Sequence, residues 1–577
     1  MPKEIYDPTS EYVNVFKESF SEECKKTFDK IAKESNVDAV SNKKLCKEIY
    51  KAKKELENIS SKITYWWTAA FVCCFMIAIA LFVIYTSPVL RPSINVEAVI
   101  LVAPLVIVLI IVSVYEHVKK LKGDSVLLES EIAGMEQEAW QQMQPLNQLF
   151  DDDIFIRMMA KTIPQIELDP YFTTQRLEDF KKVYGIESDF NSDGSVVYLQ
   201  SGAINGNPFV IYRIKDMYWG SKKYVGTKTI YWKEREKGPD GKNRTVERSE
   251  TLYASVESRY PVYFEDTRLI YGNIAAPDLV FNIKQSGFID KLGTRSFKRK
   301  IKALRKKTRK LQDKDFAIVG DESFEVAFDT TDRNNNQQFA LLFTPMAQES
   351  MINLLKNSTD GYGDDFDFQK DKMKNIITSN HMQNIDLDII PKQYQNFDYD
   401  KIKEDFYNVN TGYFRAVYFN IAPLLCVPMY RQIRSQKDIH KSKKEKEESC
   451  HWEHEALANY LGDYYFKAAS CDTQCILKTT QYSGRNGRST IMVSAYGYTK
   501  VPQVTKISVY GGDGRYHDVP VHWDDYQLVV GHGDVDIKEV DYEDKFDTQK
   551  KRMKYKNEML SENGMSVFRR HIMSEVQ

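Results

Sequence analysis

Two uncharged apolar stretches interrupt an otherwise polar chain. They are YWWTAAFVCCFMIAIALFVIYT at 65–86 and AVILVAPLVIVLIIVSVY at 98–115. In a helix each is long enough, or nearly so, to cross a hydrocarbon layer of about 30 Å. We therefore predict a two-helix transmembrane hairpin. The alternative is a pair of buried core helices, but such helices rarely stay uncharged for so long.

The residues around these stretches predict the orientation of the hairpin. Four aromatic residues at the ends of the first span have the character of interfacial anchors, namely Tyr65, Trp66, Trp67 and Tyr85. The loop between the spans contains one basic residue, Arg91, whereas lysines gather before the first span and after the second. The positive-inside rule then places both termini in the cytoplasm. We expect a multi-pass protein with two spans in the cell membrane, and the lipid bilayer as its first partner.

Apolar residues continue at heptad spacing beyond both spans. Before the first span they are Leu45, Ile49, Ala52, Leu56, Ile59 and Ile63. After the second they are Val118, Leu121, Ser125, Leu128, Ile132, Met135 and Ala139. This pattern predicts a coiled-coil stalk in which the two flanking helices run side by side into the cytoplasm. The alternative is two separate amphipathic helices packed on the globular part.

The pattern changes to strands and turns after about residue 167. Residues 194–220 alternate β-branched and aromatic positions around a Gly/Asn turn, and 228–266 repeat this around GPDGKN. The segment SFEVAFDTTDRNNNQQFALLFTPMAQESMINLL then predicts a strand, a polar turn, a short apolar strand and a helix that begins near Pro345. We expect an α+β domain over 167–360.

This last segment carries a family resemblance. The strand-like FEVAFDT and the following QFALLFTPMAQESMINLL resemble an uncharacterised family of bacterial membrane proteins with two N-terminal transmembrane helices. Their cytoplasmic β-rich domain contains an LLTP-like turn before a helix. The resemblance covers about residues 60–356 but not the basic insertion near 300 or the last 200 residues. It implies an architecture and an inner-membrane location, and it supplies no catalytic residue.

The remainder predicts a connecting region and a second β unit. Residues 413–430 are apolar but broken by Arg415, Asn420 and two prolines, which favours a buried core segment over a membrane-dipping one. The acidic GYGDDFDFQKDK reads as a solvated turn, and the charged 441–449 as a linker. From Cys450 a helix leads into strands that turn at GGDG, and a charged helix ends the chain.

The predicted fold class is therefore a membrane-anchored α+β protein with a two-helix hairpin, a helical stalk, an α+β domain and a C-terminal antiparallel β module. The expected segments are N-terminal helices 1–64, hairpin 65–115, juxtamembrane helix 116–166, α+β domain 167–360, connecting region 361–449, helix plus β module 450–544 and charged helix 545–577.

Composition agrees with this division. The chain has 577 residues, more than one hydrophobic core usually supports. Charged residues make up 28% and the net charge is −1, which is typical of a globular protein and not of a nucleic-acid-coating one. The eight cysteines are scattered, unlike a secreted disulfide framework, and the polar N-terminus lacks the apolar core of a signal peptide.

Sequence motifs for catalysis are missing. The chain has no phosphate-binding loop, no G-x-S-x-G elbow and no H-E-x-x-H zinc helix. The GGDG sequence superficially resembles a cyclase hairpin, but a tight turn accounts for it without any function.

A basic segment, RSFKRKIKALRKKTRK at 295–310, places apolar residues on one helical face and contains no acid. Its candidate residues for binding lipid or another polyanion are Lys298, Arg299, Lys300, Lys302, Arg305, Lys306, Lys307, Arg309 and Lys310. Because the hairpin tethers the domain to a membrane, anionic lipid headgroups are the favoured ligand, and nucleic acid is not expected. The alternative is a solvated face packed on the sheet.

Thiols and imidazoles gather in CHWEHEALANYLGDYYFKAASCDTQC. Cys450 and His454, and likewise Cys471 and Cys475, are spaced i, i+4, so helices would place each pair on one face. A Cys3His zinc site is one hypothesis, and zinc is the only cofactor we consider. The spacing differs from the usual C-x-x-C knuckle, so buried thiols in a packed helix are the favoured interpretation.

These observations favour a non-enzymatic role. We expect a membrane-tethered scaffold or interaction platform with a protein partner that the sequence does not identify. The alternative is a membrane-associated enzyme, hydrolytic or metal-dependent, with its site between the cytoplasmic domains.

Overall fold

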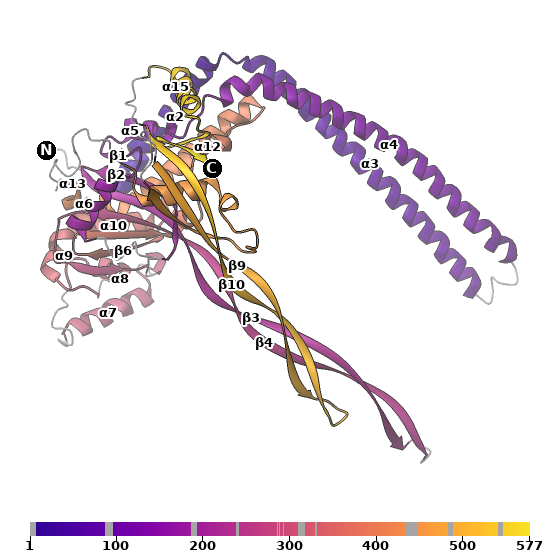
Figure 1. The fold of residues 1–577 in the computed structure, drawn as a ribbon. Helices are drawn as coiled ribbons and strands as arrows, with labels where there is room; N and C mark the ends of the chain where they lie inside the picture. The colour runs from indigo at the N-terminus through magenta and orange to yellow at the C-terminus, as the bar shows by residue number, and fades with distance from the viewer. Residues whose placement is uncertain are drawn as a thin grey trace.

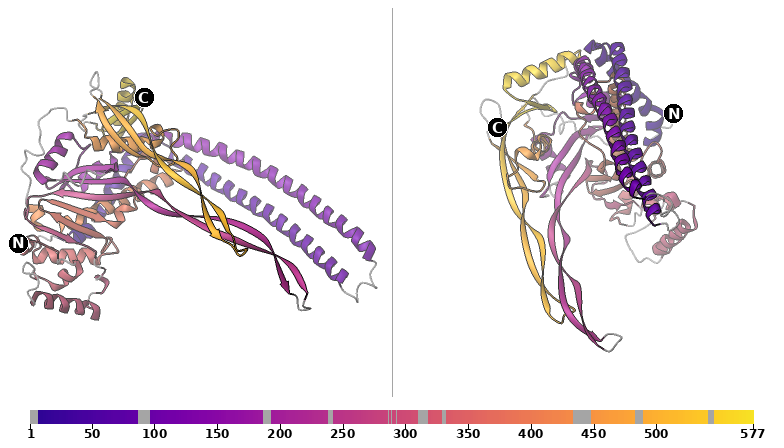
Figure 2. Two further views of the ribbon diagram at one scale, coloured as in Figure 1. Left: turned by 60° about the horizontal axis from the view of Figure 1, so that its bottom comes forward. Right: turned by 90° about the vertical axis from the view of Figure 1, so that its right-hand side faces the viewer.

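The structure is a computed structural model that describes residues 7–86, 96–185, 193–237, 242–285, 287, 289–291, 293–309, 318–328, 332–432, 448–482, 489–540 and 546–577. A body of helices and sheet lies at one end of the molecule (Figure 1). Two long helices and two long β-hairpins project from the same side of this body (Figures 1 and 2). The architecture is α+β with two antiparallel sheets, as the sequence predicts for the fold class.

A seven-stranded antiparallel sheet forms the centre of the body. Its strands lie in the order β1-β2-β3-β4-β7-β6-β5. Their bounds are β1 Ile166–Leu168, β2 Ser195–Ile204, β3 Asn207–Lys237, β4 Asn243–Gly272, β5 Val280–Ile283, β6 Phe366–Asp371 and β7 Lys374–Ser379. The sheet therefore continues past residue 360 through β6 and β7, and it places FDFQKD in a strand where the sequence suggested a solvated turn.

Both faces of this sheet are covered. On one face Leu199 and Tyr212 pack against α6 (Thr174–Tyr184) and α14 (His451–Leu461). On the other face Phe209 and Tyr271 belong to the largest apolar cluster of the described chain. Helices α2 (Lys17–Ser35), α5 (Ile154–Thr162) and α12 (Tyr399–Leu425) supply much of that cluster. The clusters on the two faces receive alternate residues of the same strands, because successive side chains in a strand point to opposite faces of the sheet.

Shorter helices complete the body. They are α1 Pro8–Glu11, the π-helix Tyr12–Phe16, α7 Arg295–Arg309, α8 Glu322–Phe328, α9 Asn336–Leu342, α10 Pro345–Lys356, α11 Asn380–Gln383, α13 Pro428–Gln432 and α15 Gln549–Asn563, with 3₁₀ turns at Ile289–Lys291, Pro391–Gln393 and Asp463–Tyr465. The helix expected near Pro345 is present as α10. Residues 413–430 lie in α12 and α13 and are largely buried, as expected of a core segment.

The prediction of two strands between 323 and 343 is wrong, because both segments are helices. Asp321 accepts a hydrogen bond from the Ser323 amide at 2.8 Å before α8. Asn335 caps α9 by accepting from the Gln338 amide at 3.0 Å. Such caps favour helices even where β-branched and aromatic residues suggest strands. In addition, the helical conformation of α8 places Glu325 against Arg333 in a buried ion pair of 2.9 Å.

Helices α3 (Ala39–Thr86) and α4 (Val96–Asn147) lie side by side along their length (Figure 1). Ile63, Ala70, Val114 and Val118 share an apolar cluster, and Lys53 on α3 pairs with Glu136 on α4 at 2.6 Å. All the heptad positions named above are buried or half-buried, as expected of residues between two packed helices. Residues 87–95, which include Arg91, lie outside the described residues.

Only one helix segment among the described residues, Ala39–Ala80 in α3, is long and apolar enough to cross a membrane. The second predicted span, 98–115, begins α4, but the side chains of residues 98–101 and 103 lie outside the description.

A second antiparallel sheet, in the order β11-β12-β10-β9-β8, is built by the C-terminal part of the chain. Its strands are β8 Ile476–Tyr482, β9 Ser489–Tyr510, β10 Tyr516–Glu539, β11 Val567–Arg569 and β12 Ile572–Val576. The predicted turn at GGDG joins β9 to β10, and α15 matches the predicted charged helix. Strands β11 and β12, which follow α15, were not expected from the sequence.

Two of the hairpins extend far beyond their sheets, and we call them the arms. The first arm consists of β3 and β4, which stay paired from Phe209 and Tyr271 to Lys237 and Asn243. The second consists of β9 and β10, paired from Ser489 and Ile537 onward to their turn. The two arms run side by side outside the body and cross in the view of Figure 1 (Figures 1 and 2). The predicted turn GPDG between β3 and β4 lies outside the described residues.

Candidate functional site

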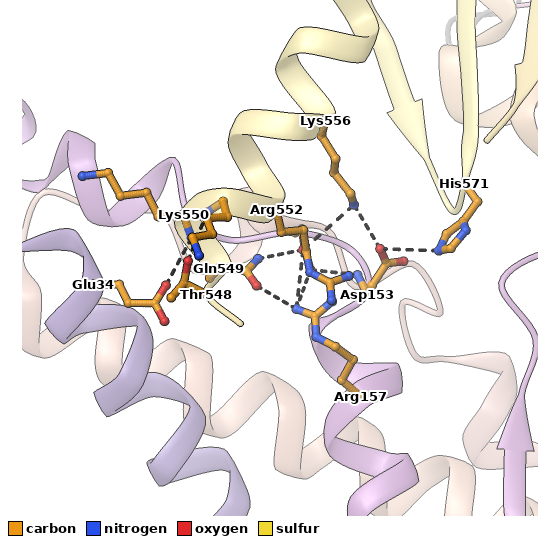
Figure 3. Close-up of polar contacts among 11 residues, drawn as sticks. Glu34, Asp153, Arg157, Thr548, Gln549, Lys550, Arg552, Lys556 and His571 are labelled. Carbon is orange, nitrogen blue, oxygen red and sulfur yellow. Dashed lines mark hydrogen bonds and ion pairs between the residues drawn. The ribbon is translucent and has the colours of Figure 1, made fainter. Parts of the chain in front are cut away.

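A buried group of opposite charges lies where the two ends of the chain meet. Asp151, Asp152 and Asp153 directly precede α5. Asp151 and Asp153 contact α15, and Asp153 also faces His571 in the turn between β11 and β12 (Figure 3). We call this group the terminal junction. The N-terminal helix α2 contributes as well, because Glu34 accepts a hydrogen bond from the Lys550 amide at 3.1 Å.

Each outer aspartate of the junction has cationic or amide partners. Lys556 donates to Asp153 Oδ2 at 3.0 Å. Arg157 donates to Asp151 Oδ1 at 3.1 Å, and Gln549 donates to Asp151 Oδ2 at 2.7 Å. The side chains of Asp151, Asp153 and Lys556 are almost completely buried. Since a buried charge is costly without a partner, these contacts fix α15 onto α5.

The terminal junction shifts the pKa values of two neighbouring aspartates in opposite directions. Burial by itself raises the pKa of Asp153, but the charges of Lys556, His571 and Arg157 outweigh burial and hold that pKa well below its usual range. Burial raises the pKa of Asp152 to about 7, because Lys556 opposes this effect only in part while Asp153 and Asp151 add to it. Asp152 therefore carries a proton over part of the neutral pH range.

A strained turn brings cations to the other side of the junction. Arg569 pairs with Ile572, so Arg570 and His571 form a two-residue hairpin turn. Both have positive φ, 45° and 65°, where Asn and Gly are the usual residues. Arg569 donates to both carboxylate oxygens of Asp388, at 2.6 and 2.8 Å. Ion pairs to the body thus hold the turn in an unfavourable conformation.

Beside the junction lies a cavity of about 40 Å³. Its polar lining consists of Asp152, Tyr198, Gln200, Asp388, Tyr413, Arg569 and Arg570. The hydroxyls of Tyr198 and Tyr413 are 2.8 Å apart, and burial raises the pKa of both. A space of this size holds roughly one to three water molecules.

The chemistry open to this cavity is limited. Asp152 can accept or release a proton near neutral pH, and Arg570 has two buried N–H groups without a hydrogen-bond partner among the described residues. Carboxyl groups can act as general acids, general bases or nucleophiles, and the lining contains two of them, Asp152 and Asp388. Asp388 is already engaged by Arg569, which leaves Asp152 as the carboxyl group with a proton to exchange.

The structure brings together only part of the proposed zinc site. Cys471 and Cys475 have their Sγ atoms 3.6 Å apart, but they lie in the loop before β8 and not on a helix, because α14 ends at Leu461. Cys450 is the residue before α14 and packs in a different apolar cluster. His454 contacts the Ser449 hydroxyl at 2.9 Å, and burial lowers its pKa to about 4.

No group of three or more His, Cys, Asp or Glu side chains is arranged to hold a metal ion within the described part of the chain. All four proposed ligands belong to that part. Their thiols fill apolar clusters between helix and sheet, which agrees with the interpretation of buried structural cysteines.

The predicted basic helix is present as α7. Its apolar residues Phe297 and Leu304 are buried against Val326 of α8, with Ile301 half-buried beside them. Of the nine basic residues proposed to bind a polyanion, Lys298, Arg299, Lys300, Lys302, Arg305, Lys306 and Arg309 have exposed side chains. Lys307 lies in the helix with its side chain outside the description, and Lys310 is outside the described residues.

The proposed membrane anchors lie on α3. Tyr65, Trp66 and Trp67 are exposed at 67%, 38% and 42%, and the Trp66 ring contacts His117 of α4 with centroids 4.8 Å apart. The side chain of Tyr85 lies outside the description.

The outer face of the first arm carries a stripe without charge. Here exposed side chains alternate with the buried ones that face the second arm. The stripe consists of Val225, Thr227, Thr229 and Tyr231 on β3 and Ser249, Thr251, Tyr253 and Ser255 on β4. Tyr231 and Tyr253 are 80% and 66% exposed. We call this set the uncharged stripe.

Sequence reasoning missed the terminal junction and the uncharged stripe. The run of three aspartates was a visible signal for the first, but its partners lie about 400 positions later in the chain. Alternating Thr and Tyr residues were a signal for the second. No protein family, curated protein or solved structure matches this chain in the comparisons made.

Proposed function

We propose that the protein is a membrane-tethered scaffold that presents the first arm to a protein partner. The observation that carries this proposal is the uncharged stripe: eight neighbouring outward positions have no charge in a chain of which 28% is charged. Exposed Tyr is enriched at protein interfaces while Lys and Glu are depleted there, and Tyr beside Ser is typical of antibody-like binding loops.

Contacts between the arms give the stripe a rigid support. Ile230, Leu252 and Ala254 of the first arm pack against Val519 and Val521 of the second in a small apolar core. An isolated two-stranded ribbon is marginally stable in water, so the second arm stabilises the first. The Gly512 amide, at the end of the second arm, also donates to Glu250 at 2.6 Å. This support favours a docking role, because a rigid surface loses less conformational entropy on binding.

Membrane attachment is the second part of the proposal. Phe71, Phe75 and Phe82 of α3 are 57–72% exposed, and so is Leu105 of α4 at 62%. Water is a poor environment for so many apolar side chains, whereas lipid is a good one. We propose that 65–86 and 98–115 span a bacterial inner membrane, with both termini in the cytoplasm. Because Asn42, Tyr50 and Lys53 of α3 still contact the body, the free part of the helix before residue 65 spans roughly 18 Å.

A membrane-associated enzyme is the second candidate, and the cavity beside Asp152 is the observation that favours it. Its position between the body and the C-terminal sheet agrees with the expected place for such a site. With space for roughly one to three water molecules, however, the cavity is much smaller than a usual ligand pocket, which favours a structural role.

Affinity capture from detergent-solubilised membranes tests the scaffold. The test variant is Tyr231→Lys with Tyr253→Lys, which adds two charges to the uncharged stripe. The control is Tyr510→Lys with Tyr516→Lys, because these tyrosines are 61% and 73% exposed on the outer face of the second arm. We expect the wild type and the control to retain a stoichiometric protein partner and the stripe variant to lose it.

The opposite results would count against the proposal. A partner that both variants retain equally would place the docking surface elsewhere. Turnover of a substrate by the purified chain, abolished by Asp152→Asn with the partner retained, would favour the enzyme.

A further inference from the structure

The apolar side of helix α7 is buried against the body. Phe297 and Leu304 are 3% and 8% exposed, and they pack with Ile301 against Val326 and Ile318. An amphipathic helix that enters a lipid interface needs this side free. The part of α7 that remains available to a ligand is therefore its exposed, charged side.

The outward side of α7 is a row of cations. At 100° per residue, the positions opposite the apolar residues are Arg295, Arg299, Lys302 and Lys306, and all four are exposed. The helix contains no acidic residue. Arg305 of α7 forms an ion pair with Glu322 at 2.6 Å, and Arg305 lies to one side of the row.

We propose that this row binds the phosphate backbone of duplex nucleic acid. A helix of this length spans roughly 22 Å, and a duplex carries one negative charge per about 1.7 Å, so several phosphates face the row at once. The row has no aromatic side chain on which the bases of a single strand could stack. An acidic protein fits less well, because protein interfaces are depleted in Lys and enriched in aromatic residues.

The position of α7 favours nucleic acid over lipid. In Figures 1 and 2, α7 lies at the end of the body away from the tips of α3 and α4. If those tips are in a bilayer, the row faces the cytoplasm and not the headgroups of the same membrane. This choice between ligands rests on the proposed membrane attachment, whereas the charge and packing of α7 do not.

Binding of the full chain to a fluorescein-labelled duplex DNA, followed by anisotropy, tests this inference. The chain is measured in neutral detergent and again in nanodiscs of phosphatidylcholine. Four phosphate contacts predict that log K falls with log [salt] at a slope of about −3.6, or roughly 150-fold between about 50 and 200 mM salt. The variant Arg295→Gln, Arg299→Gln, Lys302→Gln, Lys306→Gln removes all four contacts, so it should bind at least about tenfold more weakly and lose most of this slope.

A matched control removes the same charge from the stalk, where Lys44, Lys47, Lys51 and Lys54 are exposed on α3. This fourfold Gln variant should bind DNA as the wild type does. Thermal unfolding of both variants shows whether α7 still folds.

An equal loss of DNA binding in the α7 variant and in the stalk variant would overturn the inference. So would the absence of salt-dependent DNA binding by the wild type. Binding of the nanodisc-held chain to separate phosphatidylglycerol vesicles, with none to DNA, would overturn it in favour of lipid. A chain that binds DNA in detergent but does not enter nanodiscs would contradict the membrane attachment and leave the basic row intact.

Discussion

Gly226 of the first arm lies directly against the backbone carbonyl of Pro520 in the second arm, so closely that a Cβ atom at Gly226 would overlap the carbonyl oxygen. The residues on either side of this contact form the apolar core between the arms, with Tyr224 before it and Ile230 after it. The absence of a side chain at Gly226 thus lets the two ribbons approach closely at this point.

Replacing Gly226 by Val should separate the arms. The added side chain has no space against the Pro520 backbone, and such overpacking costs typically about 1–3 kcal/mol. We expect a lower free energy of unfolding and faster proteolysis of β9 and β10, measured by denaturant titration and limited digestion. Gly134→Ala in α4, where nothing lies within 4 Å of the new Cβ, is the control and should leave the arms protected. Unchanged protection in the Gly226 variant would show that the arms do not depend on this contact.

Loss of the buried Lys556 should release the C-terminal helix. Lys556→Met leaves the carboxylate of Asp153 buried without its closest cation, and breaking such a pair costs about 3–5 kcal/mol. Hydrogen exchange should rise across 549–576 more than elsewhere. Lys554→Met is the matched control, because Lys554 lies on the same helix with its side chain 77% exposed. Adding Asp153→Asn to Lys556→Met should recover part of the loss, and no recovery would contradict the electrostatic explanation.

Asp152 should make stability fall as the pH rises toward neutrality. Its pKa is about 7 in the folded protein, whereas an unperturbed aspartate has a pKa of 3.8, so the unfolded chain releases the proton first. The folded state therefore loses stability between these two values, and the loss is complete above pH 7. Asp152→Asn should be about 1–2 kcal/mol more stable than the wild type near pH 8, after allowance for partial exposure, and should match it near pH 4. Denaturant titrations at the two pH values measure this difference, and equal curves at both would contradict the assigned pKa.

Charges on the exposed face of α3 should weaken membrane attachment. Phe71→Lys with Phe75→Lys places two cations in the proposed span, at a cost of about 2.5–3.5 kcal/mol for each residue at the centre of a membrane helix. Alkaline carbonate extraction should leave the wild type in the membrane pellet and release much of the variant. Tyr50→Lys, at an exposed position on the stalk, is the control and should remain in the pellet. A wild-type chain that carbonate extracts fully would refute the span.

Local patterns were sufficient to predict much of the fold. The heptad positions from Leu45 to Ile63 predicted the contact between α3 and α4, because a helical period fixes which side chains face a neighbour. In the same way, the alternation around GGDG predicted the hairpin of β9 and β10. The segment at 322–328 was misassigned because its aromatic and β-branched residues suggest a strand, whereas the cap at Asp321 and the pairing of Glu325 with Arg333 favour a helix.

The junction and the arms depend on contacts between distant parts of the chain. Nothing near Asp153 in the sequence indicates that its partner is Lys556, and nothing near Gly226 indicates Pro520. Strand periodicity does not show where a hairpin leaves its sheet, since β3 and β4 alternate along the body and along the arm alike. Of the four proposed zinc ligands, Cys471 and Cys475 lie together but in a different apolar cluster from Cys450, and the spacing within the sequence did not reveal that α14 ends before Cys471.

Site-specific photo-crosslinking tests the scaffold most directly. A photoreactive amino acid replaces Thr229 in the centre of the uncharged stripe, or Ser508 on the outer face of the second arm as the control. Irradiation of intact membranes should give one defined protein adduct from position 229 and none from position 508. The absence of any adduct at 229, or the same adducts from both positions, would contradict the proposal that the first arm presents a docking surface.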